Sequence, residues 1–193
     1  MNFLSHLYLS GDSEGIIIGN FIADSVKGSN FSHFPEDVQK GIILHRKIDT
    51  FTDTHSVVEL SKERLRGNYK KYAGVIVDIY YDHFLAKNWK NYSTIGLEQY
   101  TQWIYNLVRL HYPLLPEKSA QFAHYMIQYN ILFQYSRIEG VQQVFNGMAR
   151  RAAFQSNMEY AVKDLQENYL LFEEEFKLFF PELEAYISEE LKK

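Results

Sequence analysis

The chain has 193 residues, a formal net charge of −4 and 46% hydrophobic residues, which suits one domain with a sizeable core. Because there is no cysteine, disulfides, thiolate metal sites and cysteine nucleophiles are excluded, and a reducing cytoplasm fits the composition. The acidic balance argues against nucleic-acid binding, and the lack of a basic leader or of an apolar run near ~20 residues argues against secretion and membrane insertion.

Helical periodicity dominates the sequence, with no long linker, internal repeat or series of alternating strands. The first predicted helix begins at Ser13 and stops before Gly28. The next predicted helix begins at Pro35 and ends near residues 51–54. Further helices are predicted over residues 56–66, 69–87, 97–111, 116–135, 139–151 and 158–179. Asn68 is expected to cap one of them and Pro181 to interrupt the last. The predicted fold is all-α: one compact bundle of about eight helices over residues 1–193.

Glycine and aromatic residues give two further expectations about packing. Gly41, Gly74 and Gly140 lie inside predicted helices, where they weaken helix propensity but permit close helix packing. The chain also contains 15 Tyr and 14 Phe, which predicts an aromatic core in which buried hydroxyl groups find partners.

His45, Asp49 and Asp53 form the first candidate group for chemistry. They are spaced four residues apart in a helix with apolar neighbours. Residues four apart share a helix face, so His45 and Asp49 could hold one divalent ion, or one could orient the other. Asp53 lies near the predicted helix end, where it could equally cap the following helix.

Asp78, Asp82 and His83 form the second candidate group, inside a strongly apolar and aromatic helix. Because an ionised carboxylate is costly to bury alone, each aspartate needs a cation or several hydrogen bonds. A metal ion would satisfy both aspartates at once. Hydrogen bonds to tyrosines, or salt bridges to Arg46 and Lys47, are the alternative.

Asp24 and His6 are single candidates on apolar segments. Asp24 could equally be a structural partner of a neighbouring helix, and a single histidine in such a segment is more often a core residue with its hydrogen bonds satisfied. Together the candidate residues fall on four predicted helices, and such a set can converge at the centre of a bundle. Mixed nitrogen and oxygen ligands suit Mn²⁺, Fe²⁺ or Zn²⁺, and the expected chemistry is hydrolysis by metal-activated water. No phosphate-binding loop, dinucleotide fingerprint, nucleophile elbow or zinc-protease motif is present.

Several segments carry a resemblance to a known family. They are Met-Asn-Phe-Leu-Ser-His (1–6), Gly-Asn-Phe-Ile-Ala-Asp (19–24), Gly-Ile-Ile-Leu-His-Arg-Lys-Ile-Asp-Thr-Phe-Thr-Asp-Thr-His (41–55), Tyr-Ala-Gly-Val-Ile-Val-Asp-Ile-Tyr-Tyr-Asp-His-Phe-Leu-Ala (72–86), Trp89 and Asn-Gly-Met-Ala-Arg-Arg (146–151). In their order and spacing the chain resembles the acyl carrier protein phosphodiesterases. It departs from that pattern at Tyr8, where a second His is common, at Ser25, where an aromatic residue is common, and at Ser56, usually Pro.

The resemblance implies a divergent, HD-like helical hydrolase that removes 4′-phosphopantetheine from a serine of holo acyl carrier protein. It also implies a divalent ion as cofactor, with Mn²⁺ favoured. The residues expected to bind the ion or to orient a ligand are Asp24, His45, Asp49, Asp78 and Asp82. His83 or His6 is expected to protonate the leaving serine oxygen. Arg46 is expected to hold a phosphate oxygen, but it could equally form a surface salt bridge.

An acidic carrier protein would fit a basic docking surface. The first candidate is the basic cluster of Lys62, Arg64, Arg66, Lys70 and Lys71, which could equally be a solvated helix face. Arg150 and Arg151 are the second candidate.

Two other functions stay open: a metal-dependent phosphohydrolase of a small nucleotide or phosphodiester, and a non-catalytic helical module that binds an acidic protein. The aromatic residues could line a pantetheine channel or simply fill the core.

Overall fold

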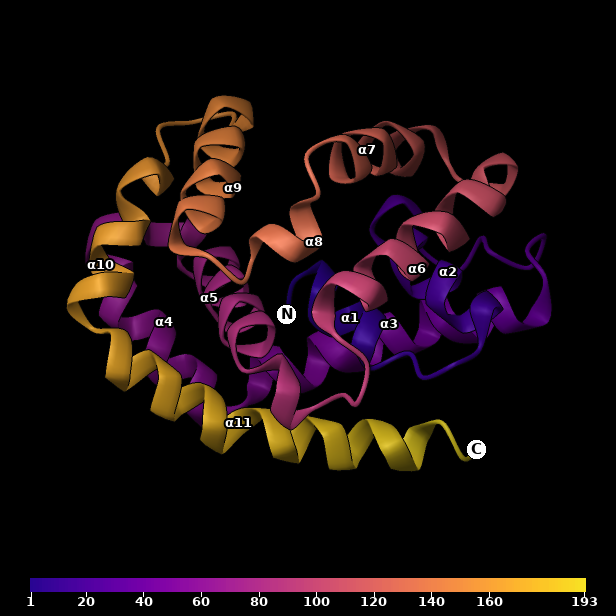
Figure 1. Cartoon of the computed structure of the whole chain (residues 1–193), viewed down its shortest axis with the longest axis horizontal. Coiled ribbons are helices and arrows are strands. Elements are labelled where there is room, and N and C mark those ends of the chain that lie inside the picture. Colours follow the sequence, from indigo (N-terminus) through magenta and orange to yellow (C-terminus); the bar gives the residue numbers. More distant parts are fainter.

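The computed structural model describes residues 1–193, and its regular structure is entirely helical (Figure 1). The eight longer helices are α2 (Glu14–Ile22), α3 (Glu36–Thr54), α4 (Ser56–Tyr69), α5 (Ala73–Lys87), α6 (Leu97–Leu110), α7 (Glu117–Gln128), α9 (Ile138–Arg151) and α11 (Tyr169–Glu190). The shorter ones are α1 (Phe3–Tyr8), α8 (Ile131–Gln134) and α10 (Ala161–Glu167). The predicted all-α fold is confirmed, and about eight is the right number for the longer helices.

Several predicted helix boundaries are wrong because left-handed residues break the chain where the sequence pattern runs on. Asn68 does not cap a helix: α4 continues to Tyr69, and Lys70 then adopts a φ of 50° before a short 3₁₀ turn leads into α5. Asn130, at φ 51°, divides the predicted helix 116–135 into α7 and α8. Asparagine tolerates this conformation better than most residues.

Pro181 does not interrupt the last helix, contrary to the prediction. Helix α11 passes through Pro181 and ends at Glu190. It packs against α3, α4 and α5, and it lies along one side of the molecule in Figure 1. The burial of Phe179, Phe180 and Leu183 around the proline compensates for the backbone hydrogen bond that proline cannot donate.

The core is rich in aromatic side chains, as the composition predicts. Tyr80, Tyr81, Phe84 and Phe176 are fully buried in one continuous hydrophobic cluster. The hydroxyl of Tyr80 donates to the carbonyl oxygen of Ala161 at 2.5 Å, and that of Tyr81 lies 2.9 Å from the Ser61 hydroxyl. Two large tyrosines are therefore buried with their polar ends satisfied.

Helix α1 is held at the centre of the molecule by Asp82 of α5. The Asp82 carboxylate accepts hydrogen bonds from the backbone N–H groups of Leu4 and Ser5 at 2.8 and 3.1 Å, and from the Ser5 hydroxyl. These amides belong to the first turn of α1, which has no partners of its own for them. Asp82 thus fixes the helix that carries His6.

Helices α2 and α3 cross at glycine residues. A Cβ at Gly19 would lie 2.0 Å from the carbonyl oxygen of Val38, and one at Gly41 would lie 2.1 Å from that of Ile16. The two backbones therefore touch directly, which confirms close packing at Gly41. No helix of the protein has both the length and the apolar character that crossing a bilayer requires.

Replacing Gly41 with Ala should destabilise the protein by about 1–3 kcal/mol, because the added methyl group must push α2 away from α3. Urea denaturation followed by circular dichroism measures the change. Gly74→Ala is the matched control: its Cβ would meet only the end of Lys62, at 3.8 Å, so helix propensity should make it neutral or stabilising. Equal effects of the two substitutions would contradict the account of the crossing.

Candidate metal site

A cavity of about 360 Å³ opens between α1, α2, α3 and α5. Its polar lining residues are Asn2, His6, Asn20, Asp24, His45, Asp49, Thr52, Asp53 and Asp78. His6 comes from α1, Asn20 from α2, and His45 and Asp49 from α3. The crossing at Gly19 and Gly41 brings α2 and α3 together beside the cavity, and Asp82 of α5 holds α1 next to them.

The two imidazole rings share one hydrogen-bond acceptor. The Nδ1 atoms of His6 and His45 each lie 2.9 Å from Oδ1 of Asn20, and the rings stack with their centroids 4.1 Å apart. Because a side-chain amide oxygen accepts hydrogen bonds, both Nδ1 atoms must carry a proton. In the neutral rings the lone pairs therefore lie on the Nε2 atoms.

The orientation of Asn20 is itself fixed by hydrogen bonds. Its amide nitrogen donates to the carbonyl oxygen of His6 at 3.0 Å and to the Ser10 hydroxyl at 2.8 Å. Ser10 in turn donates to the same carbonyl oxygen. An amide flip would lose both donations and would turn the nitrogen towards two N–H groups, so the oxygen must face the histidines.

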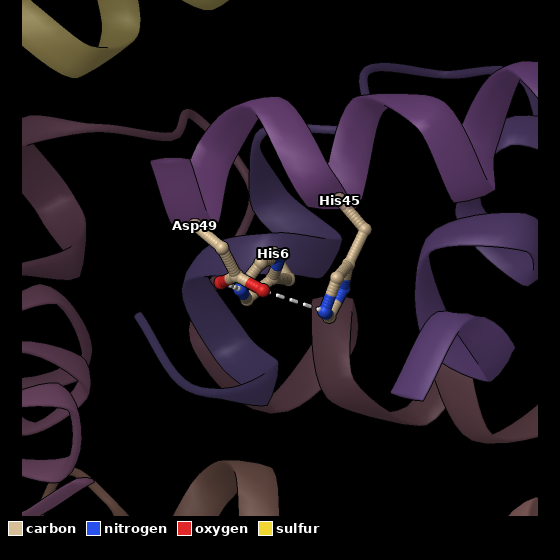
Figure 2. A group of neighbouring side chains, drawn as sticks. All are labelled: His6, His45 and Asp49. Atoms are coloured by element: carbon tan, nitrogen blue, oxygen red, sulfur yellow. Dashed lines mark ion pairs between the residues drawn. The ribbon is translucent and has the colours of Figure 1, made fainter. Parts of the chain in front are cut away.

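The Nε2 atoms face carboxylate oxygens (Figure 2). Nε2 of His45 lies 3.0 Å from Asp49 and 3.3 Å from Asp24, and Nε2 of His6 lies 3.2 Å from Asp49. The Nε2 atom of His6 is buried and has no hydrogen-bond partner. A lone pair facing a carboxylate requires a positive charge between them, which is either a proton or a metal ion.

In the absence of metal the two histidines differ in charge. Burial lowers the pKa of His6 to about 4. Burial also opposes charging of His45, but its hydrogen bonds to Asp24 and Asp49 outweigh that effect and raise the pKa to about 9. The pKa of Asp24 is lowered by His45, and that of Asp49 is lowered by both histidines despite its burial. His45 therefore carries the proton that a metal ion would replace.

Asp78 and Asp53 line the same cavity with other partners. Asp78 lies 3.1 Å from the Met1 ammonium group, and burial raises the pKa of Asp78 although the ammonium opposes this. Asp53 pairs with Lys62 at 2.8 Å. Both carboxylates therefore stand at the cavity wall, outside the group of His6, His45 and Asp49 whose ligand atoms lie within 4.8 Å of one another.

The structure does not bring Asp82, His83 or Arg46 to the cavity. Asp82 is turned to the N-terminus of α1, and burial raises its pKa to about 6. The ring of His83 lies between the Tyr135 carbonyl oxygen, 2.7 Å away, and the Tyr169 hydroxyl, 2.8 Å away. The Arg46 guanidinium donates to the carbonyl oxygen of Gly28 and supports that loop.

The basic cluster proposed for docking is largely neutralised by acidic side chains. Lys62 pairs with Asp53, Arg64 with Glu175, and Arg66 with Glu59. Lys70 and Lys71 have no acidic partner within salt-bridge distance, and Lys71 lies 4.1 Å from the centre of the exposed Phe154 ring. Arg150 and Arg151 of α9 are likewise without acidic partners; Arg151 stacks over Tyr125.

Sequence reasoning missed Asn20 and Ser10, and it assigned His6 to proton transfer alone. Asn20 lies within the Gly-Asn-Phe-Ile-Ala-Asp segment, at 1% exposure in an apolar helix. A polar amide among Ile17, Ile18 and Phe21 was a usable signal, since such a group must find hydrogen-bond partners when buried. Its two histidine partners are 14 and 25 residues away, which no local pattern reveals.

The donor set fits a divalent transition metal. His6, His45 and Asp49 offer two imidazole nitrogens and a carboxylate, and Asp24 borders them from the open side with its side chain 72% exposed. Both ligand nitrogens are oriented by a hydrogen bond at the opposite ring atom, which is the usual arrangement around protein-bound metals. The orphaned Nε2 of His6 is the atom that a metal ion would satisfy.

Comparison with known proteins gives one consistent answer. A family model described as acyl carrier protein phosphodiesterase matches residues 1–183. The chain belongs to this family. Relatives named acyl carrier protein phosphodiesterase include those of Photorhabdus laumondii, 32% identical over 94% of this chain and 92% of the relative, and of Salmonella agona, 32% identical over 96% of both. The relative from an Enterobacter species is 31% identical over 95% of both chains. No solved structure matches.

The family model covers residues 1–183, so the resemblance seen in the sequence segments is confirmed at the level of the family. The cavity residues His6, Asn20, Asp24, His45 and Asp49 all lie inside the matched region.

Asn20→Ala should weaken Mn²⁺ binding by about 10- to 100-fold, because it frees both imidazoles to rotate and to change tautomer. Isothermal titration calorimetry of the metal-stripped protein measures this affinity. The exposed Asn106 provides the control variant Asn106→Ala, which should bind like the wild type. An unchanged affinity in folded Asn20→Ala would show that the shared acceptor does not organise the ligands.

The stability of the metal-free protein should depend on pH through the two histidines. His45, with its pKa raised to about 9, contributes stability below pH 6.5 that is lost as pH rises to 9. His6, with its pKa lowered to about 4, costs stability as pH falls from 6.5 to 4. Both histidines thus favour a maximum near pH 6.5. His45→Gln should abolish the loss between pH 6.5 and 9, measured by denaturation in a chelator, whereas the exposed His124→Gln should retain it.

Proposed function

We propose that this protein hydrolyses the phosphodiester of holo acyl carrier protein and releases 4′-phosphopantetheine and the apo carrier. Family membership supports the substrate. The observation that carries the chemistry is the pair of Nε2 atoms, oriented by Asn20, that face Asp49 and Asp24. This arrangement suits a divalent ion and a phosphoryl substrate better than it suits a structural role.

We propose His6, His45 and Asp49 as the metal-binding residues, with Asp24 completing the set from the open side. Nitrogen and oxygen donors together suit Mn²⁺, which we propose as the cofactor, and they also suit Fe²⁺ or Zn²⁺. When bound, such an ion lowers the pKa of water and neutralises negative charge on the phosphoryl group. His6 thereby moves from the proton-transfer role expected from the sequence to metal binding.

Positive charge at the cavity wall would assist a substrate that is itself anionic. The Met1 ammonium group lines the cavity, and although burial disfavours its charge, Asp78 and Asp49 raise its pKa. This charge would hold a phosphate oxygen, the role that Arg46 was expected to fill. Arg46 is occupied by the Gly28 carbonyl oxygen.

Asp78 is our proposed source of the proton for the leaving group. In the reaction a water oxygen attaches to phosphorus and the bond from phosphorus to the serine oxygen breaks. That oxygen takes a proton from Asp78, and the proton that the attacking water loses restores the one that Asp78 gave up. Asp78 lies 3.1 Å from the Met1 ammonium group, and burial raises the pKa of Asp78, so Asp78 can take up a proton of this pair and pass it to the leaving oxygen. His83 is unsuited to this role, because its two ring nitrogens face Tyr135 and Tyr169.

The carrier protein would dock where basic groups are free of acidic partners. Lys70 and Lys71 follow α4, and Arg150 and Arg151 end α9. Tyr72 donates to the backbone of Phe154, which joins the two segments into one surface. This surface replaces the larger cluster that includes Lys62, Arg64 and Arg66, since those three are paired within the protein.

Incubating purified holo acyl carrier protein with this protein and Mn²⁺ should remove the mass of one phosphopantetheine, measured by intact-mass spectrometry. A chelator should abolish the loss, and Asp49→Asn should lower the rate at least 100-fold with weaker metal binding. Asp78→Asn should lower the rate while the metal affinity stays within twofold of wild type, because it removes a proton donor. The exposed Asp12→Asn is the matched control and should behave like wild type.

An unchanged carrier mass, with folded protein and bound metal, would overturn the proposed substrate. Hydrolysis of small phosphodiesters under the same conditions would then identify a phosphohydrolase of small substrates. Loss of metal binding in Asp78→Asn would instead make Asp78 a ligand.

A further inference from the structure

A second groove, of about 210 Å³, adjoins the metal cavity between α1, α7, α8 and α9. The two cavities share Asn2, Phe3 and Met148 as lining residues, so they lie next to each other. The walls of the groove are mostly apolar: Phe3 stacks on Phe122 with centroids 4.2 Å apart, and Ile131 and Val144 face them. A substrate held at the metal site could therefore extend along this groove.

Three polar groups in this apolar groove have no hydrogen-bond partner in the protein. Tyr135 is 1% exposed and lines the groove, yet its hydroxyl makes no hydrogen bond, in contrast to those of Tyr80 and Tyr81. The Tyr125 hydroxyl is also unpartnered. Asn2 uses its Oδ1 to cap α1, at 2.7 Å from the Phe3 N–H, which leaves its amide nitrogen free.

Such groups indicate a ligand of mixed character. Hydroxyl and amide groups that line a groove and have no partner within the protein are free to bind a polar group of a ligand. Apolar walls with a few convergent polar groups are typical of small-molecule sites. The groove therefore suits an extended chain in which methylene and methyl groups alternate with amides, and one end of that chain must reach the metal cavity.

We propose that this groove receives the pantetheine arm of the carrier protein while its phosphodiester lies at the metal site, an inference that rests on the proposed function. The dimethyl and methylene groups of the arm pack on Phe3, Phe122 and Val144. Its hydroxyl and two amides take up the unpaired groups of Tyr135, Tyr125 and Asn2. The arm then fixes the scissile bond at the junction of the two cavities.

Two variants test the groove without touching the metal cluster. Val144→Phe fills it, and Tyr135→Phe removes the unpartnered hydroxyl without leaving a cavity. Tyr135→Phe should lower kcat/KM for holo carrier protein by roughly three- to tenfold, the effect of one lost hydrogen bond, and Val144→Phe should lower it further. Neither should change the hydrolysis of bis(4-nitrophenyl) phosphate, which has no pantetheine arm. Leu110→Phe and Tyr160→Phe, both at exposed positions, are the matched controls.

Calorimetric binding of free pantetheine provides a second readout that requires no turnover. Wild-type protein should bind it, and Val144→Phe should bind it at least tenfold more weakly. Unchanged carrier turnover and unchanged pantetheine binding in both folded variants would overturn the groove while leaving the proposed function intact. Equal losses on the carrier and on the small diester would place the effect at the metal site and would also overturn it. Pantetheine binding lost in Val144→Phe, in a protein that cannot cleave holo carrier protein, would retain the groove and refute the proposed function.

Discussion

The direct backbone contact between α2 and α3 is the constraint on which the site depends. Gly19 and Gly41 allow carbonyl oxygens to lie where side chains would otherwise stand. Asn20 follows Gly19, and His45 lies one helical turn beyond Gly41, so the same contact brings the Asn20 oxygen within 2.9 Å of the His45 ring. Even a single methyl group at the crossing would move the two helices apart by more than a hydrogen bond can tolerate.

A second contact supplies the other histidine. Asp82 binds the first turn of α1, and this places His6 of α1 against the same Asn20 oxygen. The carboxylate that anchors α1 and the carboxylates that line the cavity thus have different roles. Asp82 satisfies backbone amides, Asp49 faces both imidazoles, and Asp78 faces the Met1 ammonium. All three residues are aspartates, so their roles differ because their burial and their partners differ.

The arrangement around the histidines lowers the stability of the folded protein, because polar and charged groups are buried there without full pairing. One imidazole nitrogen is buried without a hydrogen bond, and carboxylates gather around two rings whose pKa values are driven apart. Local conflict of this kind is typical of functional sites, which proteins compensate elsewhere in the structure. Here the aromatic core around α5 and α11, with its paired tyrosine hydroxyls, provides that compensation.

The sequence by itself determined the helical class, the number of longer helices and the family, because periodicity, composition and motif order are properties of the chain. It also identified His45 with Asp49, since residues four apart in one helix must share a face. Only the tertiary structure decided which distant residues joined them. Asp78 and Asp82 have the same spacing as His45 and Asp49, yet they face different partners: Asp82 meets the first turn of α1, whereas Asp78 meets the Met1 ammonium at the cavity wall. Only the packing of three helices reveals Asn20 as the acceptor that orients both histidines. Its contacts depend on the distances between helices, and no residue spacing within a single helix predicts them.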